Sequence, residues 1–90
     1  MSADALHVDG ELTIYRAAEL KPALLGAPVL ELAGVSEIDT AGVQLLLLAR
    51  REAQAQGRGW RIGARSAAVD EALALLGLAD SLGDLPAEAR

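Results

Sequence analysis

The sequence predicts an α/β fold in which a small sheet packs against helices. Short apolar or alternating segments, typical of strands, take turns along the 90 residues with longer segments whose apolar residues recur at helical spacing. Glycines separate many of these segments. We expect a small mixed β-sheet of about four strands packed with about three to four α-helices. A chain of this length supports one modest core, so we expect a single domain over residues 1–90 with its core at about 6–78.

The first elements are predicted to be a hairpin and a helix. Segments 6–8 and 12–14 alternate apolar and polar residues around Asp9-Gly10, a pair that favours a tight turn between two strands. Apolar residues then recur at helical spacing over 17–25. Pro22 has no backbone N–H to donate, so this helix should be short or kinked.

The middle of the chain predicts a buried strand and then the longest helix. Residues 28–33 are almost continuously apolar, which is typical of a central strand covered on both faces. A helix is expected from about Thr40 to Gln56, and Gly57 suits the left-handed position that ends many helices.

The C-terminal third predicts one more strand, one more helix and a tail. The strand is expected at 60–64, and Ser66 is a candidate N-cap for a third helix that Gly77 ends. Residues 79–90 are rich in Asp, Gly, Pro and Glu, so we expect a flexible or loosely packed tail with at most a short edge strand.

Composition argues against several classes of function. Acidic residues outnumber basic ones 13 to 8, and this net charge of −5 argues against nucleic-acid binding. The absence of cysteine excludes disulfides and thiolate chemistry. The longest apolar run, Leu45 to Ala49, is far shorter than the roughly 20 residues that span a bilayer, and the N-terminus does not have the pattern of a secretory signal. We therefore expect a cytoplasmic protein without direct membrane insertion.

Basic residues gather in one part of the sequence. Arginines lie near the end of the longest predicted helix and in the strand after it, at Arg50, Arg51, Arg58 and Arg61. They form either a local basic patch or a solvated face that partly balances the dipole at the helix C-terminus.

The sequence contains none of the usual motifs for catalysis or cofactor binding. The only histidine, His7, has no nucleophile motif near it, and there is no P-loop, GxGxxG or paired metal-ligand spacing. Glu31, Glu37 and Asp39 could approach one another across a strand end, although Glu37 is better explained as a loop charge and Glu31 as an edge-facing or solvent-facing one. Asp39 could also be a phospho-accepting aspartate, but such a site needs an acidic magnesium pocket, for which Asp9 is the one candidate. We expect no enzyme activity, no cofactor and no metal.

Residues 35–50 contain the strongest functional signal. An apolar strand runs into Asp39-Thr40-Ala41-Gly42 and then into a leucine-rich helix. Asp39 is a good N-cap, and a phosphate on Thr40 would lie at the positive end of the helix dipole. The alternative is that Asp39 and Thr40 only cap the helix while Gly42 allows close strand-to-helix packing.

The leucine-rich helix has more apolar residues than one core-facing stripe needs. At 100° per residue the expected core stripe consists of Leu45, Leu46, Ala49 and Ala53. Leu47 and Val43 should then lie near the polar side, as an exposed apolar pair beside Thr40. Such a pair indicates a contact surface for a partner protein, unless a neighbouring loop covers it.

The segment VSEIDTAGVQLLL resembles the apolar-x-x-apolar-Asp-[Ser/Thr]-small-Gly-apolar signature of single-domain STAS proteins, which are named for sulfate transporters and anti-sigma factor antagonists. Further similarity lies in GELTIYRAAEL, in the segment from Gly57 to Ser66 and in Leu76-Gly77-Leu78. The resemblance covers about residues 6–78 and implies a STAS-like fold.

The resemblance also implies a docking function. In anti-sigma factor antagonists the residue after the aspartate is a serine that a cognate anti-sigma kinase phosphorylates, which blocks binding. Thr40 occupies this position, and Ala41 replaces a usual second hydroxyl. By this resemblance Thr40 is the regulatory phosphoacceptor, and the partner-binding residues are Asp39, Ala41, Gly42, Val43 and Leu47. Gly42 would let the partner or the phosphate approach the backbone.

Three kinds of STAS protein share an arrangement of this type. The first is the anti-sigma factor antagonist, whose partner is an anti-sigma factor or a serine/threonine kinase-like protein. The STAS subunit of the bacterial phospholipid ABC transporter has a similar Asp-Thr-small-Gly and binds the ATPase subunit. STAS proteins linked to chemosensory systems are also similar. The resemblance thus implies a partner switch, with a constitutive partner-binding subunit as the alternative.

Overall fold

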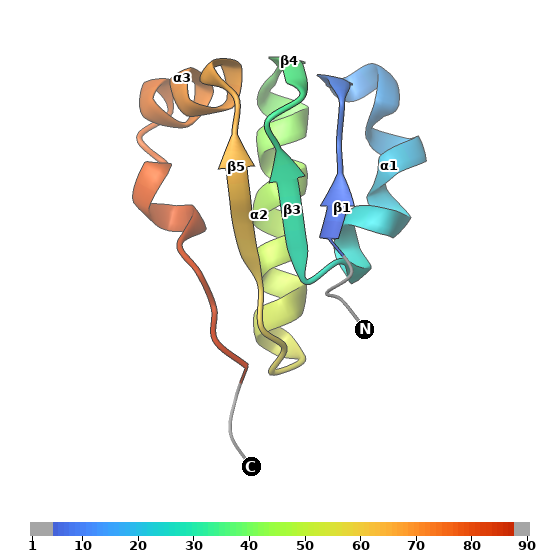
Figure 1. Ribbon diagram of the computed structural model, residues 1–90, viewed down its shortest axis with the longest axis vertical. Helices are drawn as coiled ribbons and strands as arrows, with labels where there is room; N and C mark the ends of the chain where they lie inside the picture. Colours follow the sequence, from blue (N-terminus) through green and yellow to red (C-terminus); the bar gives the residue numbers. More distant parts are fainter. Residues whose placement is uncertain (1–4, 88–90) are drawn as a thin grey trace.

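The computed structural model describes residues 5–87, which form strands and helices of an α/β fold. Figure 1 shows the long helix α2 running lengthwise behind β3, with α1 beside β1 and α3 at the upper end of β5. The elements in chain order are β1 (Ala5–His7), β2 (Gly10–Leu12), α1 (Ile14–Gly26), β3 (Val29–Leu32), β4 (Val35–Ile38), α2 (Thr40–Ala55), β5 (Arg61–Arg65), α3 (Ala67–Leu75) and the 3-10 helix η1 (Ala79–Leu82).

The strands form a three-stranded and a two-stranded sheet. In the first, β3 lies between β1 and β5 and is parallel to both, which confirms its predicted central position. In the second, β2 pairs with β4, again in parallel. Within residues 5–87 the antiparallel pairing is confined to one bridge between Trp60 and Leu85. The α/β class is therefore confirmed, with parallel pairing dominant in the predicted mixed sheet.

The predicted N-terminal hairpin is wrong. Strands β1 and β2 pair with β3 and β4 respectively, instead of with each other. The offset between paired residues is 24 for Ala5 with Val29 and 25 for Gly10 with Val35, and it becomes 26 for Leu12 with Ile38 because β4 contains one extra residue at the irregularity. The apolar partner strand outweighs the local turn preference of Asp9-Gly10.

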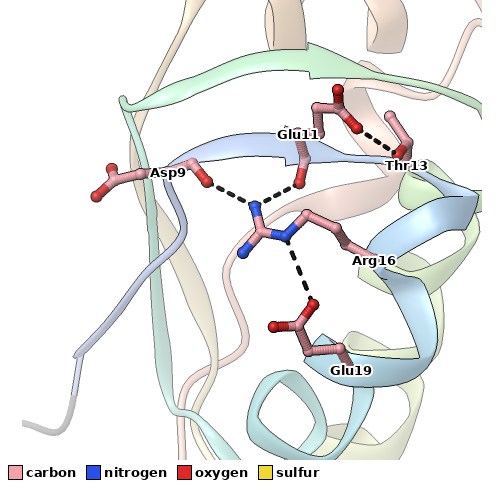
Figure 2. A network of polar contacts seen from close by, with 5 residues as sticks. All are labelled: Asp9, Glu11, Thr13, Arg16 and Glu19. Carbon is pink, nitrogen blue, oxygen red and sulfur yellow. Dashed lines mark hydrogen bonds and ion pairs between the residues drawn. The ribbon is translucent and has the colours of Figure 1, made fainter.

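Arg16 holds the bend between β1 and β2 in place. Its Nη1 donates to the backbone oxygens of Asp9 (2.7 Å) and Glu11 (2.8 Å), and its Nε lies 3.8 Å from Glu19 Oε1 (Figure 2). Gly10 adopts φ +80°, a backbone conformation that favours glycine. The tight-turn residues thus bend the chain between two strands that pair with different partners, without folding them back on each other as a hairpin.

The predicted helix boundaries are largely correct. Ser66 Oγ accepts the backbone N–H of Val69 at the start of α3, as predicted. Gly57 and Gly77 have φ of +66° and +68° after α2 and α3. Helix α1, by contrast, is not short, since it starts at Ile14 and includes Pro22 on its exposed side.

One core of aliphatic side chains joins the sheets to the helices. Helices α1 and α2 pack side by side, and α3 packs against β4. The predicted core stripe of α2 is confirmed, and the largest fully buried side chains are Val8, Leu12, Leu24, Leu30, Leu32, Val35, Val43, Leu46, Val69 and Leu73. None of the helices in the described part of the chain combines the length and the apolar character needed to cross a membrane.

The expectation of a loosely packed tail is wrong for its first residues. Leu82 is buried in the core, and Arg50 Nε donates to the backbone oxygen of Gly83 at 2.8 Å. Trp60 and Leu85 exchange two backbone hydrogen bonds of 2.8 and 2.7 Å. The core therefore continues past its predicted limit at residue 78, whereas residues 88–90 lie outside the described residues.

Candidate functional site

Asp39 connects the first turns of two helices. Its Oδ1 accepts the backbone N–H of Gly42 in α2, and its Oδ2 accepts the backbone N–H of Ile14 in α1, each at 3.0 Å. The N–H of Ile14, followed by that of Gly42, favours the ionised carboxylate and lowers the pKa of Asp39 below its ordinary value of 3.8. The N-cap function predicted for α2 is confirmed, and the same carboxylate also serves α1.

The second function of Asp39 compensates for a missing cap. Thr13 stands at the N-cap position of α1 but its side chain makes no cap hydrogen bond. Instead its hydroxyl donates to Glu11 Oε1 at 3.3 Å (Figure 2). A carboxylate 25 residues away takes over, so both helices begin at the same end of the molecule, next to β4 (Figure 1).

Thr40 lies exposed at the first position of α2. Among residues 5–87, none forms a hydrogen bond with its hydroxyl. Ile14 and Tyr15, the first residues of α1, are 64% and 88% exposed. Because Ile14 N donates to Asp39, the residue before Thr40, these two apolar residues lie close to the start of α2.

The sequence interpretation missed Ile14 and Tyr15, because it placed residues 12–14 in a hairpin strand. The available signal was Thr13, a residue type that often precedes a helix. Read as a cap, it would have started α1 at Ile14.

Gly42 is buried by the protein itself. A Cβ added there would lie 2.1 Å from the backbone oxygen of Leu12 and 2.9 Å from Ile38 Cγ1, so no larger residue fits without displacing backbone. The expectation that Gly42 leaves its backbone open to a partner or phosphate is wrong. The alternative reading of Gly42 is confirmed: it allows the start of α2 to pack closely against the neighbouring strands.

Val43 is also a core residue, with 1% of its surface exposed, so its expected exposure is wrong. Helices α1 and η1 both contact α2, so neighbours other than the sheet widen the buried arc of α2 beyond the stripe that a sheet alone would cover. Leu47 lies at the edge of that arc, where it is half-buried and packs against the core. The predicted exposed pair is thus reduced to part of Leu47.

An open groove of about 710 Å³ follows the outer side of α2 from Ala41 to Gln54. Half-buried apolar side chains, Ala41, Leu47 and Leu48, line it together with the more deeply buried Leu45. Lys21 of α1 borders one part of the groove and Ser81 of η1 another. The groove adjoins Thr40 through Ala41, so the exposed hydroxyl and the apolar channel form one continuous surface.

The four arginines singled out in the sequence separate into two groups. Arg50 and Arg51 line the groove, where Lys21 joins them. Arg58 and Arg61 lie outside it: Arg58 Nη2 donates to the backbone oxygen of Leu25 at 2.9 Å, and Arg61 is exposed in β5. The basic patch is therefore smaller than the four arginines suggested and lies on α2.

The acidic residues provide no clustered site. Glu31 Oε1 accepts the backbone N–H of Ala64 at 2.8 Å. Within residues 5–87, no group of three His, Cys, Asp or Glu side chains is placed to hold a metal ion.

Strands alternating with helices, and a long helix that starts at Asp39-Thr40-Ala41-Gly42, define the class of protein. This chain belongs to the STAS family. The matching family is described as "Mlab, STAS domain", and the match covers residues 1–85. No curated protein matches the chain. Membership supports a regulatory, protein-interaction role of the STAS type.

Proposed function

We propose that this STAS domain is a non-enzymatic docking module that binds a partner protein through the start and outer side of α2. The observation that supports this most is the continuity between the exposed Thr40 and the apolar groove that begins at Ala41. Tyr15 and Ile14 extend the apolar surface on the other side of Asp39. Contiguous exposed apolar surface of this kind is typical of protein contact sites.

In its first form, the proposed module is a partner switch controlled by phosphorylation of Thr40. The exposed, first-turn position of Thr40 supports this form, because a kinase can reach it and the helix dipole stabilises an added phosphate. The phosphate would add a charge of about −1.5 to −2 beside Asp39 and the apolar Ile14. Docking would then require the phosphate to lose its water, so binding of an anti-sigma factor or kinase-like partner would stop.

In its second form, the module is a constitutive subunit that binds the ATPase of a phospholipid ABC transporter or a chemosensory partner. The match to the family described as "Mlab, STAS domain" supports this form. Ala41 supports it too, because it supplies no second hydroxyl at the helix start.

Intact mass measurement distinguishes the two forms. The domain is incubated with ATP and the candidate kinase from the same genome, beside a Thr40→Val variant that keeps the side-chain shape and removes the hydroxyl. The switch form predicts one added phosphate in the wild type and none in the variant. An unmodified wild type that still binds the candidate transporter ATPase supports the constitutive form.

A binding measurement tests the shared proposal. Gln44 is exposed and lines the groove, so Gln44→Trp, which adds a bulky neutral side chain, should block docking without disturbing the core. We expect affinity for the partner to fall about tenfold or more, as for a residue near the centre of an interface. If Gln44→Trp and Thr40→Glu both bind the partner like the wild type, docking through this surface is wrong.

A further inference from the structure

The charge of the groove is opposite to that of the molecule. Three of the eight basic residues line it, Lys21, Arg50 and Arg51, and none of the acidic residues in 5–87 does. The whole chain nevertheless has 13 acidic residues and a net charge of −5. An apolar groove with a basic border on an acidic protein indicates the chemistry of the molecule that fits there.

Two of these basic side chains are available to a partner. Arg51 and Lys21 are exposed, and the ion pairs found within residues 5–87 involve Arg16 and Arg65 instead. Arg50 is only partly available to a partner, because its Nε donates to the backbone oxygen of Gly83 and so fixes the segment after η1. A partner can therefore meet two free cations at the border and one anchored cation nearby.

The length of the groove suits a short helix. From Ala41 to Gln54 the α2 axis rises by roughly 20 Å at about 1.5 Å per residue. A partner helix of about 14 residues has the same length. The apolar side chains of Leu47 and Leu48 lie within this length, with Gln44 and Gln54 as polar neighbours.

We propose that this groove binds an acidic amphipathic helix of the partner protein. The apolar stripe of that helix would cover Leu47 and Leu48, while its carboxylates would pair with Lys21 and Arg51. This inference rests on the proposed docking function and adds the chemical nature of the partner. Salt screens the attraction between these carboxylates and the basic border of the groove, so binding should weaken as the salt concentration rises.

Two designed peptides of about 14 residues test the proposal. Both carry leucines at i, i+3, i+4 and i+7, and the other positions are glutamate in one peptide and lysine in the other. Binding to the full chain is followed by amide chemical shifts. The glutamate peptide should perturb residues 41–54 and lose about tenfold in affinity between roughly 50 and 300 mM NaCl, whereas the lysine peptide should not bind.

Charge reversal supplies the matched control. The double variant Lys21→Glu/Arg51→Glu should bind the glutamate peptide at least about tenfold more weakly. Arg61→Glu changes an exposed arginine in β5, outside the groove, and should leave the affinity unchanged. Equal binding of both peptides, or equal loss in both variants, would overturn the proposal.

Other occupants give different results. Binding to phosphatidylglycerol vesicles in preference to the glutamate peptide would overturn the proposal and indicate an anionic lipid surface. Concentration-dependent dimers with shifts at both 41–54 and the exposed Leu75 and Leu76 of α3 would overturn it in favour of a second copy of the chain.

Measuring how the variants bind the natural partner distinguishes this inference from the docking function on which it rests. If Gln44→Trp abolishes partner binding while Lys21→Glu/Arg51→Glu has no effect, docking stands and the acidic helix is wrong. If neither change affects partner binding, the docking function itself fails.

Discussion

Replacing Gly42 by alanine tests how closely α2 is seated on β2 and β4. The added Cβ would lie 2.1 Å from Leu12 O and 2.9 Å from Ile38 Cγ1, and the first of these atoms is backbone, which cannot rotate away. Overpacking of a core lowers the free energy of unfolding by about 1–3 kcal/mol. Because the added Cβ would meet backbone, Gly42→Ala should lie near the upper end of this range. The better helix propensity of alanine returns up to about 1 kcal/mol, so the net loss is about 2 kcal/mol.

The assay is thermal unfolding followed by circular dichroism. A loss of about 2 kcal/mol corresponds to a Tm lower by about 8–16 °C in a domain of this size. Gly26→Ala is the matched control, because an added Cβ at the end of α1 meets nothing within 4 Å. We expect that control to change Tm only slightly, with a gain of up to about 1 kcal/mol. Equal Tm values for the two variants would refute the close seating of α2.

Three further predictions concern the cap, the switch hydroxyl and the tail. Asp39 has a lowered pKa in the folded state, so its stabilising contribution is present above pH 3.8 and is lost as the pH falls through the lowered value. Asp39→Asn should therefore reduce the fall of Tm on acidification, and an unchanged dependence of Tm on acid pH would contradict the assignment. Thr40→Val should leave Tm within about 2 °C, since the hydroxyl has no partner among the described residues, and a larger drop would reveal a structural hydroxyl. Leu82→Ala should lower the free energy of unfolding in urea by about 2 kcal/mol, because Leu82 is 3% exposed, and Leu75→Ala, at 87% exposed, by less than about 0.5 kcal/mol. Equal losses would mean that the tail does not pack.

Local signals account for what the sequence predicted correctly. Asp39 and Ser66 cap helices through contacts within three residues, and Gly57 ends a helix through its own backbone conformation. The continuous apolar character of 28–33 indicated the central strand in the same way. Each of these features can be read from a few neighbouring residues.

The errors arose where distant segments decide the outcome. Asp9-Gly10 has the local chemistry of a hairpin turn, but the pairing of β1 and β2 depends on strands about 25 residues away. Val43 is buried because α2 has packing neighbours besides the sheet, which a helical projection of α2 alone does not include. The bond between Asp39 and Ile14 likewise joins two helix starts that only the folded chain brings together.

The candidate site was predictable in its position and less so in its composition. The Asp-Thr-Ala-Gly junction located the start of α2, and the resemblance pointed to docking there. The groove, however, requires side chains from α1, α2 and η1, three elements that are not adjacent in the sequence. Its basic border could not be inferred from the arginines alone, since Lys21 lies about 30 residues before Arg51.

The most direct test of the central claim compares the same substitution at two leucines. Leu47→Glu places a charge in the groove on α2, and Leu75→Glu places it on the exposed end of α3, outside the groove. Affinity for the partner that binds the wild-type domain is measured by isothermal titration calorimetry, with folding of each variant checked by circular dichroism. Docking along α2 predicts a loss of about tenfold or more for Leu47→Glu and little change for Leu75→Glu. A folded Leu47→Glu variant that binds like the wild type would contradict the account.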